Sequence, residues 1–330
     1  MKNTIFKAMV VKETPGGKFE RKIIKKSVND LPAGNVLVKI SYSSLNYKDA
    51  LSASGNKGVT RNYPHTPGID AAGTVAESSS DDFNPGDPVI VTSYDLGMNT
   101  DGGFGEYIRV PADWVVKLPD NLTLKESMIY GTAGLTAGLS VYKLTHTLAP
   151  DRGEILVTGA SGGVGSMAVS MLAQSGYEVV GVSGKVEERE FLKKIGVKEI
   201  ITRQDATDTS GRPVLKERWA GVIDTVGGEI LTTAIKSTKL NGNVTCCGNV
   251  ASPDLTLTVF PFILRGVSLY GIDSQHCLMN TRVKIWEKLA GEWKLNNLES
   301  LVSEISLNDL DEKIDLMLAG KVKGRTVVKL

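Results

Sequence analysis

A glycine-rich stretch, ILVTGASGGVGSMAV at residues 155–169, carries the clearest chemical signal in the chain. An apolar run leads into the glycines, and a run with helical spacing follows them. In a strand, turn and helix of this kind, backbone amides at the helix N-terminus can hold a pyrophosphate. Ala160, Gly162 and Gly165 occupy the three key positions, with Ala160 where a first glycine is usual. The stretch predicts a dinucleotide site, and a ligand-free tight turn is the alternative.

The next apolar strand indicates which dinucleotide is bound. NAD sites usually place Asp or Glu about 20 residues beyond the glycine loop, where it binds the ribose 2′-hydroxyl. Here the strand ends VGVSGKVEER, so Ser183, Gly184 and Lys185 fill that position without a carboxylate. Arg203, just after the third strand, could reach the same phosphate as Lys185. The pattern favours NADPH over NAD, unless both cations are ordinary surface charges.

A third chemical segment, LNYKDA at residues 45–50, follows the strand-like run VLVKISYSS. It offers Asn46, Tyr47 and Asp49 but no cysteine or histidine. The Tyr-x-x-x-Lys pair of short-chain dehydrogenases is absent, because none of the nine tyrosines has a lysine four residues on. We expect Tyr47 to act at the nicotinamide end of the cofactor, with a phenol packed between domains as the alternative.

These residues need elements that position them. Residues 1–125 read as short strands separated by glycine and proline, which predicts an antiparallel, barrel-like β domain. Near Leu122 the pattern becomes helical, with Thr123 as N-cap and Glu126 three residues later. From Glu154 six β-like runs alternate with helices, which predicts a doubly wound parallel sheet.

The terminal run TVVKL has no obvious partner in a completed six-stranded sheet, so we expect it to return to the first domain. The predicted domains are therefore 1–125 with 297–330, and an inserted nucleotide-binding domain over 126–296.

Composition limits the classes of function. The chain has 330 residues, 41% of them hydrophobic and 23% charged, with a formal net charge of +1. These values favour a two-domain globular protein without a nucleic-acid or membrane partner. Three cysteines and the absence of a visible export signal in MKNTIFKAMVVKE predict a cytoplasmic location.

The order of the two domains resembles the medium-chain dehydrogenase/reductase superfamily. Zinc alcohol dehydrogenases of that superfamily carry Cys-x-x-Asp where this chain has Asn46 to Asp49, and Gly-His-Glu where it has Gly68, Ile69 and Asp70. Isoleucine cannot bind zinc, so no metal site is expected. The resemblance is to the zinc-independent, quinone-reductase-like branch and implies a GroES-like β-barrel catalytic domain plus a Rossmann domain, as a homodimer.

Several segments, among them SSLNYKDAL, IYGTAGLTA, PFILRGVSLYGIDS and KGRTVVK, look closer still to NADPH-dependent acrylyl-CoA reductases. That family implies reduction of the carbon-carbon double bond of acryloyl-CoA to propionyl-CoA by hydride transfer to the β-carbon. An NADPH:quinone oxidoreductase and a non-catalytic NADPH-binding sensor or structural protein remain alternatives. The thioester carbonyl of the substrate already delocalises the negative charge that develops. The protein therefore needs to supply only hydrogen-bond donors and a proton source.

The resemblance and the motifs together assign roles to particular residues. The expected catalytic residues are Tyr47, Asn46 and Asp70. The expected cofactor-binding residues are Tyr47, Ser161, Gly162, Gly163, Val164, Gly165, Ser183, Gly184, Lys185, Arg203, Asn249, Ile263 and Ser274. Candidate cations for the phosphates of CoA, each with ordinary surface charge as the alternative, are Lys57, Arg61, Arg265 and Arg325.

Overall fold

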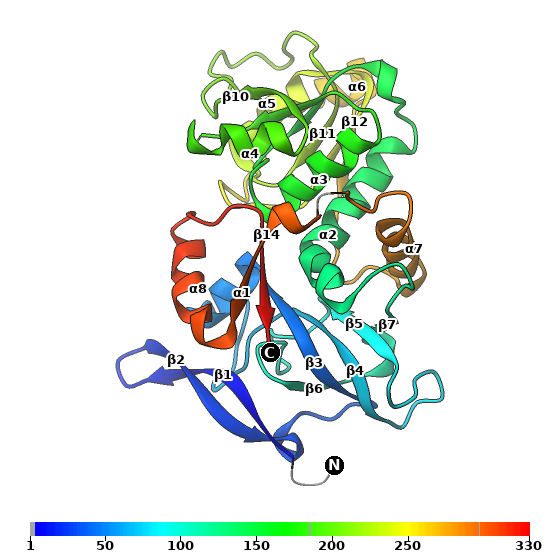
Figure 1. Cartoon of the computed structure of the whole chain (residues 1–330). Coiled ribbons are helices and arrows are strands. Elements are labelled where there is room, and N and C mark those ends of the chain that lie inside the picture. The colour runs from blue at the N-terminus through cyan, green and yellow to red at the C-terminus, as the bar shows by residue number, and fades with distance from the viewer. Residues whose placement is uncertain (1–3, 185, 297) are drawn as a thin grey trace. The chain divides into compact units, whose positions relative to one another are not determined.

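The computed structural model describes residues 4–184, 186–296 and 298–330, and the chain divides into two compact units (Figure 1). The first unit comprises Met1–Thr132, Gln275–Ala290 and Asn297–Leu330, and the second comprises Ala133–Ser274 and Gly291–Asn296. The domain boundaries from the sequence stay a prediction. They place 275–290 in the nucleotide-binding domain, whereas by its contacts this segment belongs to the first unit, where Arg282 donates to the Thr92 carbonyl at 2.9 Å.

The first unit contains a two-stranded hairpin and a seven-stranded sheet. The hairpin pairs β1 (Ile5–Thr14) with β2 (Lys18–Ser27). The sheet has the order β14-β15-β3-β4-β5-β7, with β6 also paired to β3. Its strands are β3 (Val36–Leu45), β4 (Asp70–Ser78), β5 (Pro88–Thr92), β6 (Tyr107–Val110), β7 (Val115–Lys117), β14 (Val302–Ser306) and β15 (Arg325–Lys329).

The apolar periodicity of these strands builds the core. Val36, Val38 and Ile40 alternate along β3 and pack with Val89 and Val91 of β5 in one buried cluster. The terminal strand does return to this unit, because β15 pairs antiparallel with β3 and parallel with β14 (Figure 1). The strand β2 has little apolar alternation, because its sequence KFERKIIKKS is largely basic.

The helices of this unit flank the segments of chemical interest. They are α1 (Tyr47–Ala53), α7 (Met279–Ala290), α8 (Leu310–Leu318) and the start of α2 (Leu124–Thr145). The predicted capping of α2 is confirmed, since Thr123 Oγ1 accepts from the Glu126 amide and Glu126 accepts from the Thr123 amide. Gly131, with φ of 51°, interrupts the helical backbone of α2.

The second unit is the predicted doubly wound sheet. Its six parallel strands have the order β10-β9-β8-β11-β12-β13, the 3-2-1-4-5-6 order typical of dinucleotide-binding folds. The strands are β8 (Ile155–Val157), β9 (Val179–Val182), β10 (Val197–Ile201), β11 (Trp219–Asp224), β12 (Thr238–Cys246) and β13 (Ser268–Gly271). The helices are α3 (Gly163–Gln174), α4 (Arg189–Lys194), α5 (Gly228–Lys236) and α6 (Phe260–Arg265).

Short 3₁₀ turns complete the chain: η1 (Val28–Asp30), η2 (Ala112–Trp114), η3 (Pro150–Arg152), η4 (Val186–Glu188), η5 (Leu298–Leu301) and η6 (Leu307–Asp309). Within the described ranges, no helix has both the length and the apolar character needed to cross a membrane.

Candidate functional site

The glycine loop of the second unit links β8 to α3, and two of its glycines leave no room for a side chain. Gly159 has φ of 58°, and a Cβ there would lie 2.3 Å from Thr225 Oγ1. A Cβ on Gly165 would lie 2.2 Å from the Gly159 carbonyl oxygen, so only glycine lets α3 pack this closely on the loop. The predicted role of Gly165 in close packing therefore has a geometric basis. The residue that makes the tight turn is Gly159, one residue before Ala160, which the sequence analysis placed at the first key position.

The start of α3 can receive an anion. Gly162 is its N-cap, and the amides of Gly163, Val164 and Gly165 form the first turn, where helix geometry leaves donors without intrahelical acceptors. These amides and the positive end of the helix dipole suit a phosphate group. The residues present therefore fit the pyrophosphate of a dinucleotide.

A buried aspartate that the sequence prediction missed secures this loop. Asp224, at the end of β11, accepts from Thr158 Oγ1 at 2.7 Å and from the Gly227 amide at 2.8 Å. Burial raises the pKa of Asp224, and these hydrogen bonds oppose that shift. The signal was present in the sequence, because a carboxylate ends a buried parallel strand in AGVIDTVGG.

Four predicted cofactor residues line one pocket at the carboxyl ends of the strands. They are Ser161, Ser183, Gly184 and Arg203, which follow β8, β9 and β10. Arg203 lies beside Gly184, whose Cβ position would be 3.3 Å from Arg203 Nε. The parallel strands therefore bring together residues that lie as far as 42 positions apart in the chain.

The same pocket contains a carboxylate that the sequence prediction did not place there. Glu188, at the end of η4 and only 4% exposed, accepts a hydrogen bond from Ser183 Oγ at 3.0 Å. The position directly after β9 carries no carboxylate, as expected, but the turn after β9 brings Glu188 into the pocket beside Ser183. Lys185, the other cation expected here, lies outside the described residues.

The remaining predicted cofactor residues are more dispersed. Asn249 is exposed after β12, and Ser274 follows β13 and accepts from Thr136 Oγ1 at 2.9 Å. Ile263 lies on α6 with 68% of its surface exposed. Arg265, two residues on, donates to the Thr238 carbonyl at the start of β12, so α6 ends at the amino edge of the sheet. The structure does not bring Ile263 together with the pocket residues.

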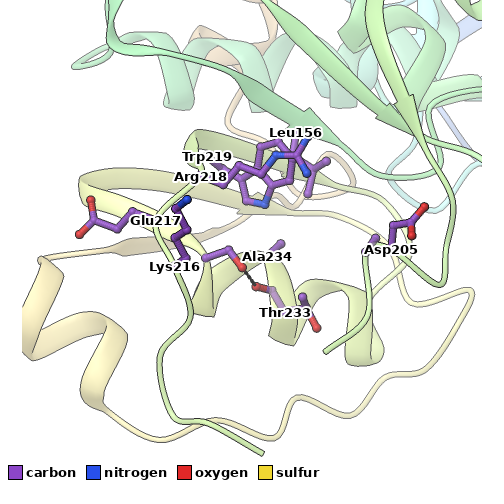
Figure 2. Close-up of a pocket in the computed structure, with 10 residues that line it drawn as sticks. Leu156, Asp205, Lys216, Glu217, Arg218, Trp219, Thr233 and Ala234 are labelled. Carbon is purple, nitrogen blue, oxygen red and sulfur yellow. Dashed lines mark hydrogen bonds between the residues drawn. The ribbon is translucent and has the colours of Figure 1, made fainter. Parts of the chain in front are cut away.

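A second hollow in this unit has a different set of lining residues (Figure 2). Leu156 and Trp219 contribute apolar surface, and the Arg218 guanidinium stacks 4.1 Å from the Trp219 ring centroid. Arg218 also pairs with Glu199 at 2.9 Å, and Ser237 donates to the Thr233 carbonyl on α5. None of the predicted cofactor residues lines this hollow, so it is not part of the predicted nucleotide site.

In the first unit, two of the three predicted catalytic residues meet in a buried polar cluster. Asn46 Nδ2 donates to Asp70 Oδ2 at 2.8 Å and to Asp49 Oδ2 at 3.2 Å. Asp49 also accepts from the Asn46 amide and from the Ile69 amide, both at 2.8 Å. Burial, and then the Asp70 carboxylate, raise the pKa of Asp49 to about 7.

Arg325 provides the positive charge of this cluster. It donates to Asn46 Oδ1 at 3.0 Å and to Ser44 Oγ at 2.8 Å, and its Nη2 lies 3.7 Å from Asp70 Oδ2. Thr132 adds hydrogen bonds to Asp70 from its amide and its hydroxyl. Burial lowers the pKa of Arg325, while the two carboxylates oppose that shift.

These residues do not fit a zinc ion. The Arg325 guanidinium lies next to the Asp70 carboxylate, where its positive charge would repel a metal dication. The side chain of Asn46 is already hydrogen-bonded to Asp70 and Arg325. No group of three His, Cys, Asp or Glu side chains in the described part of the chain could hold a metal. Gly131 makes room for the cluster, because a Cβ there would lie 2.4 Å from Asp70 Oδ2.

Tyr47, the third predicted catalytic residue, has a different environment. It begins α1, and 44% of the residue's surface is exposed. Its neighbour Asn46 is 9% exposed, and Asp70 is fully buried. Only Tyr47 among the three is therefore placed to touch a bound molecule over a large area.

Three of the four candidate cations for CoA have other partners. Arg325 is buried in the cluster, and Arg265 donates to the carbonyls of Lys236 and Thr238. Lys57 pairs with Glu13 at 2.6 Å. Arg61 is exposed, and its role as a CoA contact stays a prediction.

Both units match known family models. Residues 32–120 match the alcohol dehydrogenase GroES-like domain, and residues 163–290 match the zinc-binding dehydrogenase model. The description of the second model refers to zinc binding, whereas the cluster around Asn46 contains a guanidinium.

The chain is also similar to individual proteins. YhfP of Bacillus subtilis, whose name assigns it to the quinone oxidoreductases, is 45% identical over 92% of this chain and 93% of its own length. The acrylyl-CoA reductase AcuI of Ruegeria pomeroyi is 41% identical over 98% of this chain and 99% of its own. The YhdH oxidoreductase of Salmonella enterica, solved with NADP, has 39% identity and a TM-score of 0.95, covering 98% and 99% of the two chains.

The fold and the family resemblance predicted from the sequence are thus confirmed. The chain belongs to the medium-chain dehydrogenase/reductase superfamily of oxidoreductases, in the family that includes the acrylyl-CoA reductase AcuI and YhfP.

Proposed function

We propose that the protein reduces the carbon-carbon double bond of acryloyl-CoA with NADPH and forms propionyl-CoA. The observation that carries this proposal is the similarity to the Ruegeria acrylyl-CoA reductase, which extends over almost the whole of both chains. The metal-free cluster around Asn46 supports it, because conjugate reduction of a thioester needs no Lewis acid in the protein.

NADPH is the proposed cofactor and supplies the hydride for the β-carbon of the double bond. The first-turn amides of α3 hold its pyrophosphate, and Arg203 attracts its 2′-phosphate. The NADP-bound Salmonella relative supports this choice. The YhfP structure, 43% identical with a TM-score of 0.96 over 99% of this chain and 100% of its own, contains NAD instead, so the pocket around Ser183 needs a direct test.

Tyr47 is the proposed contact for the nicotinamide and the substrate carbonyl. A phenol hydroxyl can donate to the oxygen that becomes negative as the hydride arrives, which stabilises the enolate. Asn46 and Asp70 would act as positioning residues, because their side chains bind each other within the cluster. We propose no proton donor for the α-carbon.

A quinone oxidoreductase is the second candidate function, supported by the name of YhfP. Purified protein would be assayed with NADPH and either acryloyl-CoA or a quinone, and the thioester product would be identified by mass spectrometry. We expect propionyl-CoA and a higher kcat/KM for acryloyl-CoA. Quinone turnover without acryloyl-CoA turnover would replace the first proposal by the second. Nucleotide binding without turnover of any enoyl thioester, enone or quinone would indicate a sensor or structural protein.

We also propose a homodimer formed through the free edge of the second unit's sheet. β13 is an edge strand, and nearby side chains on or beside α6 are exposed apolar residues, namely Val259, Phe260, Ile263 and Leu264. A cytoplasmic location stays a prediction, and the three free cysteines are consistent with it.

A further inference from the structure

The hollow drawn in Figure 2 lies where the second unit's sheet lacks a crossover helix. In a doubly wound sheet, the connection between two parallel strands usually contains a helix that packs on the sheet. The connection from β10 to β11, residues 202–218, is described throughout and contains no helix. Gly211 and Pro213 within it disfavour one. A cavity of about 310 Å³ remains, at the lower end of the range for small-molecule sites.

Part of the lining of this hollow is apolar. Leu156 of β8, Ala206 after β10 and Ala234 of α5 line it, and all three belong to one buried hydrophobic cluster. Apolar surface of this kind favours a ligand with an apolar body, because contact removes both surfaces from water.

Trp219 adds a hydrogen-bond donor that lacks an acceptor. The residue is only 4% exposed, and its indole nitrogen has no hydrogen-bond partner in the part of the chain that the structure describes. Unlike Trp286 Nε1, this nitrogen is not sealed from solvent. Figure 2 shows it on the edge of the ring that is turned toward Ala234. Since an indole N–H only donates, the hollow needs an acceptor on the ligand.

Lys216 adds a positive charge to the lining. It is exposed and forms no ion pair with any described residue. The carboxylates of the lining have partners, because Glu217 pairs with Arg265 at 3.4 Å and Asp205 accepts from Thr202 Oγ1 at 2.7 Å. Asp205 also lies on the opposite side of the hollow from Lys216 (Figure 2). An ammonium group beside an indole N–H suits a carboxylate.

We propose that this hollow binds a small organic carboxylate with an apolar body. The carboxylate accepts hydrogen bonds from Trp219 Nε1 and the Lys216 ammonium, and the body packs against Leu156, Ala206 and Ala234. The hollow shares no lining residue with the pocket around Ser183. The inference therefore does not depend on the proposed function.

The test follows the indole N–H resonance of Trp219 by NMR in the ¹⁵N-labelled full-length protein, with benzoate as the probe. The resonance is identified by its loss in Trp219→Phe. If that variant does not fold, Arg218→Lys identifies it by a shift, because the Arg218 guanidinium stacks on the same ring. We expect benzoate to move the resonance with saturation and a Kd of about 1–10 mM, as for a ligand of its size. Acetate has the same charge without the apolar body and should bind at least about tenfold more weakly.

A charge variant tests the contribution of the ammonium group. In Lys216→Gln we expect the Kd for benzoate to rise about threefold, as for loss of an exposed ion pair. The matched control is Lys193→Gln, which removes an exposed lysine on α4 outside the hollow and should leave the Kd unchanged.

Three results would overturn the proposal. The first is a Trp219 resonance that stays unmoved at benzoate concentrations well above the expected Kd. The second is an equal response to acetate and benzoate, which would indicate a general effect of salt. The third is an equal change of Kd in Lys216→Gln and Lys193→Gln. Because none of these measurements uses NADPH or acryloyl-CoA, failure of the proposed function would leave this test unaffected.

Discussion

Asn46 joins the two buried carboxylates and Arg325 of the polar cluster in the first unit. Its amide nitrogen donates to two buried carboxylates, and its amide oxygen accepts from Arg325. A cysteine at this position could not make these three contacts, because a thiol offers only one weak donor and a weak acceptor. The replacement therefore removes a metal ligand and also supplies the hydrogen bonds that keep the cluster satisfied.

Tyr47, the exposed residue beside it, gives the first mutational prediction. Changing Tyr47→Phe removes only the hydroxyl, and we expect kcat with acryloyl-CoA to fall by about 100-fold, as for loss of a transition-state donor. The Kd for NADPH should change little, and both are measured by steady-state kinetics and titration. Tyr63→Phe is the control, since Tyr63 donates to the Ser52 carbonyl inside the unit. Unchanged kinetics would assign Tyr47 to packing.

Asp49 gives a prediction about pH. Its folded-state pKa of about 7 is higher than the ordinary value of 3.8, because its burial and the Asp70 carboxylate disfavour the charge. The folded state therefore binds the proton more tightly, and the stabilisation from protonation is lost as pH rises through about 7. Its size is at most about 4 kcal/mol, from about 1.4 kcal/mol for each unit of pKa difference.

We expect the free energy of unfolding of wild type, relative to Asp49→Asn, to decrease from pH 5 to pH 8. Chemical denaturation across this range measures it, and the comparison cancels the contributions of other titrating groups. A constant difference between the two proteins would show that Asp49 stays ionised throughout, held so by its hydrogen bonds to Asn46 and Ile69.

The loop between β8 and α3 shows how an element places its donors. Gly165 allows the helix to approach the Gly159 carbonyl, and Asp224 ties the same loop to the end of β11. The loop that leads to the first-turn amides of α3 is therefore held by a close backbone contact and by the buried side chains of Thr158 and Asp224. This rigidity suits anion binding, because the donors need no reordering when the ligand arrives.

Substitution of Gly165 tests this packing. In Gly165→Ala the new Cβ would overlap the Gly159 carbonyl, so α3 must move outward. We expect a loss of about 1–3 kcal/mol in the free energy of unfolding, as for overpacking, with weaker NADPH binding. Gly271→Ala is the control in the same unit, since its Cβ position is open, and it should change stability by less than about 0.5 kcal/mol. Equal effects would mean that the close approach is not required.

At the scale of the whole molecule, the sheet of the second unit ends at β13, which pairs with no further strand among the described residues. Exposed edges invite pairing with another chain, and a closed two-fold pairing would satisfy β13 and cover Val259 and Leu264. A protein that remained monomeric would have to tolerate these apolar side chains in water.

We expect the wild type to be a dimer by light scattering after size-exclusion chromatography, and Val259→Asp with Leu264→Asp to be monomeric. Both residues are more than 60% exposed in the single chain, so the charges should not affect its folding. NADPH binding serves as the control for intact structure. A monomeric wild type would contradict the proposed dimer directly.

Much of this protein could be predicted from its sequence because the relevant signals are local. Strand, turn and helix periodicity predicted the doubly wound sheet, the glycine loop and the capped start of α2. The close packing at Gly165 could also be predicted from the sequence, because a glycine at this position of the loop allows the helix backbone to approach the strand. The sequence alone also shows that Asn46 and Ile69 stand where zinc alcohol dehydrogenases carry a cysteine and a histidine.

Other features depend on contacts between residues that are distant in the sequence or that a turn brings together. No local sequence pattern predicts such contacts. Arg325 meets Asn46 across 279 positions only because β15 returns beside β3, so a predicted CoA contact became part of a buried cluster. Glu188 meets Ser183 only because η4 turns back after β9. Composition and motif order thus determine the superfamily and its chemistry, whereas charge pairing in three dimensions determines which side chains remain available to a ligand.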